Sequence, residues 1–141
     1  MAAVDIGAST VKASESAPPR NVQIEAETYR LITDDELKNA LRGKTMIDLA
    51  KRAAMALTGW TESFSAEGNL YGRSGDRLPW MKGTFEIYSD HYCTAIGSTE
   101  CYALVKSDRG DLATISLRDG IWVNPVRIEI HPTRSGRDPV P

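Results

Sequence analysis

Residues 80–105 restrict the possible folds more than any other part of the chain. Three short runs of aromatic and β-branched residues, which favour strands, alternate there with residues that favour turns. A turn at residues 89–90 would place Ile87 opposite Tyr92 on the next strand. A second turn at residues 97–99 would start a third strand. The stretch therefore predicts a meander of three antiparallel strands, and such a sheet buries one of its faces.

Cys93 and Cys101 are the only two cysteines of the chain, and both lie in this stretch. A turn centred on Gly97 would put them opposite each other on adjacent strands, close enough for a disulfide. The alternative is a pair of buried free thiols. A disulfide persists in an oxidising compartment, so we expect a periplasmic or secreted protein, with a cytoplasmic location as the alternative.

The composition is that of one ordinary globular domain. The chain has 141 residues, a net charge of −2 and an isoelectric point near 5.7. This charge balance gives no support for binding to nucleic acid. The sequence holds no run of about 18 apolar residues, so we expect no membrane span.

The two ends of the chain differ in character from its middle. Residues 1–20 are rich in Ala, Ser and Pro and lack the apolar segment of a signal peptide. Either the protein is cytosolic with a disordered start, or a signal peptide has been removed from an exported protein. We expect a disordered segment at 1–20, a single domain at 21–131 and a flexible tail at 132–141.

The clearest helix signal begins at Thr33, which Glu36 follows at the spacing of a capping box. Gly43 stands where a helix commonly ends. The pattern predicts a helix over residues 34–42 that covers one end of the sheet through an apolar face made of Leu37, Ala40 and Leu41. Residues 48–58 fit a second helix, and they are nearly as compatible with a buried strand.

Further strands are expected at residues 21–30, 45–47, 60–65, 69–73, 112–117 and 121–130. In the last of these, Trp122 should share a face with Val126, Ile128 and Ile130, and Pro125 favours a sheet edge or a bulge. Seven or eight short antiparallel strands linked by tight turns predict a mainly β fold, either a closed or nearly closed barrel or a sandwich.

Short motifs along the chain resemble those of a known group of proteins. They are Gly43-Lys44-Thr45 after the helix, then Phe64, Glu67-Gly68 and Gly72-Arg73, then Gly83-Thr84-Phe85, Asp90, Cys93 and Cys101-Tyr102. Over residues 31–117 the chain thus resembles small exported proteobacterial proteins with a lipocalin-like, or calycin-like, β-barrel. The resemblance implies an antiparallel barrel in the cell envelope. Most such families have no assigned function.

Aromatic residues occur on nearly every expected strand, and they bury large areas in small cores. Some of them could instead line a barrel cavity that holds an apolar ligand. The candidate ligand-binding residues are Trp60, Glu62, Tyr71, Trp80, Tyr92 and Trp122. We expect a non-catalytic barrel that binds either a small ligand there or a partner protein through loops such as residues 75–81.

The alternative is a small barrel enzyme, of isomerase, cyclase or hydrolase type, that uses acid–base residues without a cofactor. Its ionisable groups would be Asp90, His91, Tyr92 and Glu62, and it requires Glu62 and His91 to face one pocket. Cys93 could serve as a thiol nucleophile if His91 lay beside it. The sequence contains no metal-ligand signature, phosphate-binding loop or serine-nucleophile motif, so we expect neither a metal nor a cofactor.

Overall fold

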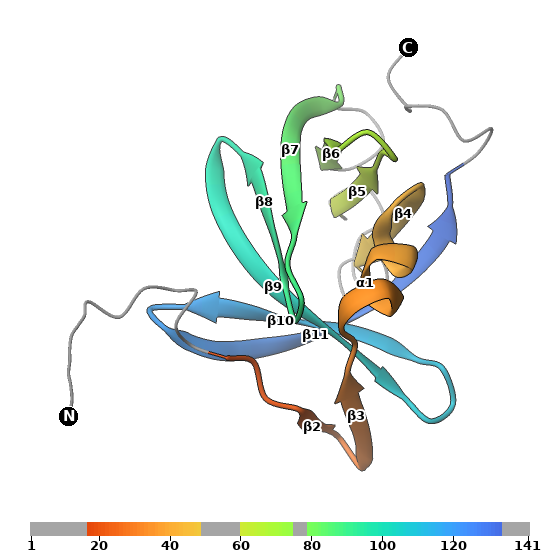
Figure 1. Cartoon of the computed structure of the whole chain (residues 1–141), viewed down its shortest axis with the longest axis vertical. Helices are drawn as coiled ribbons and strands as arrows, with labels where there is room; N and C mark the ends of the chain where they lie inside the picture. The colour runs from red at the N-terminus through yellow and green to blue at the C-terminus, as the bar shows by residue number, and fades with distance from the viewer. Residues whose placement is uncertain (1–16, 49–59, 75–78, 134–141) are drawn as a thin grey trace.

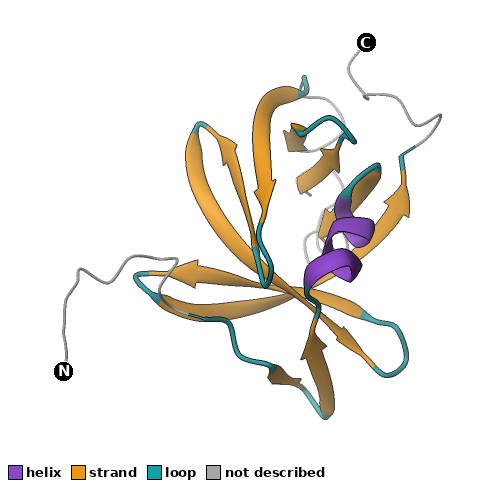
Figure 2. Ribbon diagram, in the orientation of Figure 1, coloured by secondary structure: helices purple, strands orange, loops and turns teal. Residues whose placement is uncertain are grey.

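The computed structural model describes residues 17–48, 60–74 and 79–133, in which strands predominate and one short helix follows the first two (Figure 2). The elements are β2 (Asn21–Ile24), β3 (Glu27–Leu31), α1 (Asp34–Leu41), β4 (Lys44–Asp48), β5 (Trp60–Phe64), β6 (Asn69–Ser74), β7 (Met81–Ile87), β8 (Tyr92–Ile96), β9 (Ser98–Ser107), β10 (Leu112–Arg118) and β11 (Ile121–Pro132). No helix in these ranges is long and apolar enough to cross a membrane.

Eight of the strands, β4 to β11, close into an antiparallel barrel. Each pairs with the next along the chain, and β11 returns to pair with β4. Tight turns of the predicted kind connect the consecutive strands β7, β8 and β9. Ile87 lies opposite Tyr92 in the first of these hairpins, as expected. The prediction of a mainly β antiparallel barrel is confirmed.

The segment expected to form one strand over residues 21–30 is instead a hairpin, β2–β3, outside the barrel (Figure 1). The chain reverses at Glu25, which adopts a positive φ of 57°. β3 then pairs with the end of β9, which extends beyond β8. Tyr29 of this hairpin is fully buried in a second apolar cluster with Val105, Ala113 and Ile115. Period-2 alternation alone could not reveal this reversal, because it continues across the turn.

Helix α1 closes one end of the barrel, and Figure 1 shows it beside β4. Its apolar face matches the prediction, since Leu37 and Leu41 are fully buried and Ala40 packs against the same cluster. They meet the inward side chains of the barrel strands, among them Phe64, Leu70, Phe85 and Leu104. Gly43, which follows the C-cap residue Arg42, has the positive φ (74°) that favours glycine.

The predicted capping box is absent. Thr33 is the N-cap, but its side chain makes no capping hydrogen bond. Glu36 instead accepts two hydrogen bonds from the Arg30 guanidinium, at 3.1 and 3.2 Å. The backbone N–H of Asp34 donates to the carbonyl of Ser89 at 2.8 Å, so the β7–β8 turn satisfies a donor at the start of the helix. Tertiary partners have replaced the local cap.

Strand β11 changes face partway along its length. Thr114 pairs with Val126 and Ser116 with Val123, so β11 holds one residue more than β10 between these pairs. This bulge, at Asn124 with a φ of 59°, reverses the alternation of side chains. The prediction that Trp122 shares a face with Val126 is therefore wrong. Trp122 packs outside the barrel against the Tyr29 cluster.

The expected disulfide between Cys93 and Cys101 is present, with the two Cα atoms 4.0 Å apart across β8 and β9. Other expectations lie outside the described residues. Residues 49–59 include nearly all of the segment expected to be a second helix or a buried strand, and residues 75–78 belong to the loop considered for partner binding. Most of the start that was expected to be disordered (residues 1–20) and most of the tail that was expected to be flexible (residues 132–141) also fall outside them.

We predict that Thr33→Ala changes the free energy of unfolding by less than about 0.5 kcal/mol, because the threonine side chain makes no capping bond. Leu37→Ala, in the same helix, should cost roughly 2–5 kcal/mol, because it empties a fully buried site. Urea denaturation of both variants measures the difference. A loss of about 1 kcal/mol or more in Thr33→Ala would show that the capping box forms in solution.

Candidate functional site

The barrel interior is filled near α1 and hollow toward the opposite end. Large inward side chains such as Phe64, Leu70 and Leu104 occupy the filled part. Further along the strands the inward positions hold small residues, including Thr114 and Ser116 of β10. The result is a cavity of about 950 Å³, lined by residues of β4, β5 and β7 to β11.

Trp60 of β5 lines the cavity, and its indole packs over Gly72 of the neighbouring strand β6. A Cβ atom added to Gly72 would collide with the six-membered ring of Trp60 and would come within 2.8 Å of Cδ1 of Ile96. Because Gly72 has no side chain, the indole of Trp60 can lie against its backbone.

Glu62 of β5 is the most deeply buried carboxyl group of the cavity, with only 9% of its surface exposed. The pKa of Glu62 is raised from 4.5 to about 7, mainly by burial and to a smaller extent by the nearby Glu100 carboxylate. A hydrogen bond from the Trp60 side chain acts in the opposite direction and favours the ionised form. Glu62 can therefore exchange a proton near neutral pH.

Two stacked tyrosines, Tyr92 and Tyr102, form another part of the wall, with ring centroids 5.5 Å apart. The Tyr92 hydroxyl points to Sδ of Met46 at 3.7 Å, and the Tyr102 hydroxyl donates to Glu100 at 2.7 Å. Burial raises the pKa of both phenols above 10, so they stay protonated hydrogen-bond donors at neutral pH. Arg118 lies 3.6 Å from the same Glu100 carboxylate.

The structure brings together half of the six residues expected to bind a ligand. Trp60, Glu62 and Tyr92 line the cavity. Tyr71 projects from β6 to the outer side of the barrel, because its neighbours Leu70 and Gly72 face inward. Trp80 precedes β7 and lies 4.5 Å below the guanidinium of Arg73. Trp122 is also outside the barrel, for the reason given above.

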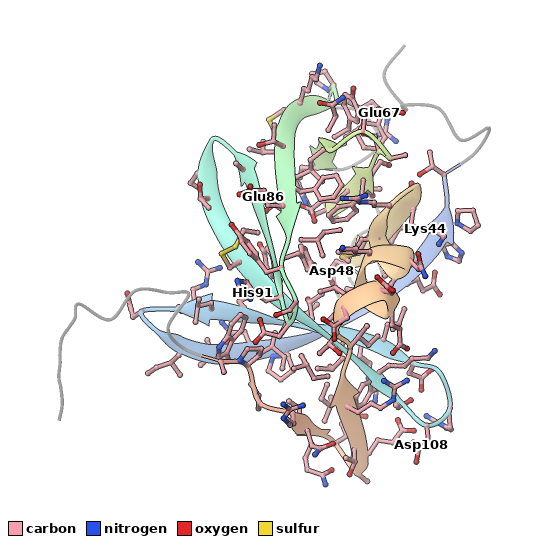
Figure 3. The ribbon with its side chains drawn as sticks, viewed as in Figure 1. Lys44, Asp48, Glu67, Glu86, His91 and Asp108 are labelled. Carbon is pink, nitrogen blue, oxygen red and sulfur yellow. A yellow bond between two sulfur atoms is a disulfide. The ribbon has the colours of Figure 1, made fainter. Side chains whose placement is uncertain are left out.

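The residues considered for catalysis do not meet in one pocket. His91, labelled in Figure 3, lies in the β7–β8 turn, whereas Glu62 comes from β5. His91 contacts Asp90 through Nδ1 at 2.7 Å and stacks on Tyr88. It is not among the cavity residues, whereas Glu62 is. Cys93, considered as a nucleophile, is bonded to Cys101.

Several cavity residues were not identified from the sequence, namely Asp48, Thr94, Glu100, Tyr102, Thr114, Ser116 and Arg118. The predicted pairing of Cys93 with Cys101 could have identified three of them. If the disulfide lies on the outer side of β8 and β9, the residues next to each cysteine must point into the barrel. Within the described ranges, no group of three histidine, cysteine or carboxylate residues could hold a metal ion.

Comparison of the chain with protein-family models, with curated proteins and with solved structures finds no match. The site must therefore be interpreted from its own geometry.

We predict that Glu62→Gln stabilises the protein at about pH 8 and changes little at about pH 4. Between about pH 4.5 and 7 the folded chain holds a proton on Glu62 that the unfolded chain has lost, so stability falls as the pH rises through this window. Relative to wild type, the variant should therefore gain about 3 kcal/mol between the two pH values.

Urea denaturation at both pH values measures this gain, with Glu67→Gln as the control. Glu67 lies exposed in the turn between β5 and β6, well apart from Asp48 of the cavity (Figure 3). The same stability difference between wild type and Glu62→Gln at both pH values would contradict the prediction.

Proposed function

We propose that the barrel binds a small molecule in its interior, between Trp60 and the stacked pair of Tyr92 and Tyr102. The observation that carries this proposal is the cavity of about 950 Å³. An eight-stranded barrel is either filled by its own side chains or left with room for one small ligand. The cavity volume falls at the upper end of the range that is typical of ligand sites.

The chemistry of the walls supports the same function. Aromatic and aliphatic side chains supply most of the contact surface, and a few buried polar groups stand among them. This combination is typical of small-molecule sites, in which apolar walls provide affinity and polar groups fix the orientation. The acid–base alternative has less support, because Glu62 lines the cavity and His91 does not.

An emission experiment tests binding. Trp80→Phe and Trp122→Phe leave Trp60 as the only tryptophan, so its fluorescence reports on the cavity. The neutral probe N-phenylnaphthylamine should bind this background and quench Trp60. Thr114→Phe places an aromatic ring in the cavity and should weaken binding by at least about tenfold, because the added ring occupies the site.

The matched control is Thr84→Phe, which makes the same change at an exposed position of β7. It should bind the probe as the background chain does. Circular dichroism of each variant checks that the barrel is intact. Equal affinity of folded Thr114→Phe and Thr84→Phe, or no binding to either the background or the control, would contradict a ligand site in the barrel.

We also propose that the protein works outside the cytoplasm, in the periplasm or after secretion. The support is the Cys93–Cys101 disulfide, a bond that reducing compartments do not maintain. The resemblance to exported lipocalin-like proteins points to the same compartment.

Intact-mass analysis under non-reducing conditions should give a mass lower by two hydrogen atoms than that of the dithiol. The double variant with Cys93→Ser and Cys101→Ser should lose roughly 2–3 kcal/mol of unfolding free energy, because its unfolded chain is no longer closed into a short loop. Two free thiols after exposure to air would contradict both the bond and the compartment.

A further inference from the structure

The described lining of the cavity holds more acidic than basic side chains. Asp48, Glu62 and Glu100 line it from β4, β5 and β9, and the only basic side chain among its described lining residues is Arg118. Arg118 lies 3.6 Å from Glu100, so its charge is directed toward that carboxylate. The guanidinium of Arg118 is thus engaged by Glu100 and not by Glu62.

Among the carboxylates that line the cavity, Glu62 is the most buried, so a positively charged partner would stabilise its ionised form the most. Within the described part of the chain, Glu62 accepts a hydrogen bond from the Trp60 side chain, and no lysine, arginine or histidine there forms an ion pair with it. A buried ionised carboxylate without a counter-ion is strongly destabilising, because it loses its hydration and gains no opposite charge in return. The site is thus incomplete when Glu62 is ionised and no ligand is bound.

The aromatic walls favour the same kind of ligand. Trp60 lies two residues from Glu62 on the same side of β5, and Tyr92 and Tyr102 are close enough to Glu62 for its charge to raise their pKa values. The faces of indole and phenol rings attract cations, and the attraction is strongest where water is excluded. A carboxylate flanked by aromatic faces is therefore complementary to a positively charged organic group.

We propose that the ligand of this cavity is a small organic cation, an ammonium group on an aromatic or aliphatic body, and that the Glu62 carboxylate is its counter-ion. The proposal rests on the binding function proposed above. An organic anion would be repelled by Glu62 and Glu100. A neutral molecule would leave ionised Glu62 without a counter-ion. A bare metal ion would need a set of ligands that the described residues do not provide.

Binding should depend on pH, because an ammonium group pairs with Glu62 only when the carboxyl is ionised. Burial raises the pKa of Glu62 to about 7. The charged and titratable groups that share the cavity with it are Asp48 on β4, Tyr92 on β8, Glu100 and Tyr102 on β9, and Arg118 on β10. Affinity for a cation should therefore fall by up to about tenfold for each pH unit below 7. Affinity for a neutral analogue should not.

The test uses three probes with one aromatic body: naphthylethylamine, naphthylethanol and naphthylacetate. At about pH 8 the first is a cation, the second is neutral and the third is an anion, since alkylamines ionise much as lysine does. Calorimetric or fluorescence titration of the wild-type chain should rank them in that order. We expect the amine to bind at least about tenfold more tightly than the alcohol.

Glu62→Gln keeps the size and an oxygen acceptor for Trp60 but removes the charge. It should reduce the affinity for naphthylethylamine by at least about tenfold and leave that for naphthylethanol nearly unchanged. The control is Glu67→Gln, which removes the same charge from an exposed turn and should preserve the preference for the amine.

The outcomes separate the two proposals. If the alcohol or the acetate binds as tightly as the amine, the cavity binds ligands but the cation proposal is overturned. If none of the three binds, both proposals fail. If Glu62→Gln keeps the full preference for the amine, Glu62 is not the counter-ion and the inference is overturned.

Discussion

The ten-residue strand β9 is the element on which most of the structure depends, because it pairs with β8, β10 and β3. Its successive side chains point to opposite sides. Glu100, Tyr102 and Leu104 face the barrel interior and contribute to the cavity and the core. Cys101 and Val105 face outward, where they join the disulfide and the second apolar cluster. A slip of one residue in its pairing would exchange these two sets.

Features set by short-range chemistry could be predicted from the sequence. The turns at residues 89–90 and at Gly97 fixed the pairing of β7, β8 and β9, and with it the disulfide between Cys93 and Cys101. The apolar face of α1 followed from helical spacing, and it did meet the end of the barrel. In each case the residues that determine the structure are neighbours in the chain.

Features set by distant partners could not be predicted. Glu36 pairs with Arg30 of β3 rather than capping its own helix. The bulge in β11 turned Trp122 away from the cavity, although Pro125 had suggested an irregularity nearby. Whether the barrel is filled or hollow depends on the sizes of inward side chains from all its strands, such as Thr114 and Ser116. These side chains share one interior only because β11 pairs with β4 and closes the barrel, and that long-range pairing is not visible in the sequence.

The central claim is that a hollow barrel shields the Glu62 carboxyl from water. Carbon-13 NMR of the chain labelled at its glutamate carboxyl groups measures this directly, with the Glu62 signal assigned by its loss in Glu62→Gln. Burial predicts that this signal titrates with a midpoint near pH 7. A midpoint near 4.5, the value of an exposed glutamate, would contradict the claim.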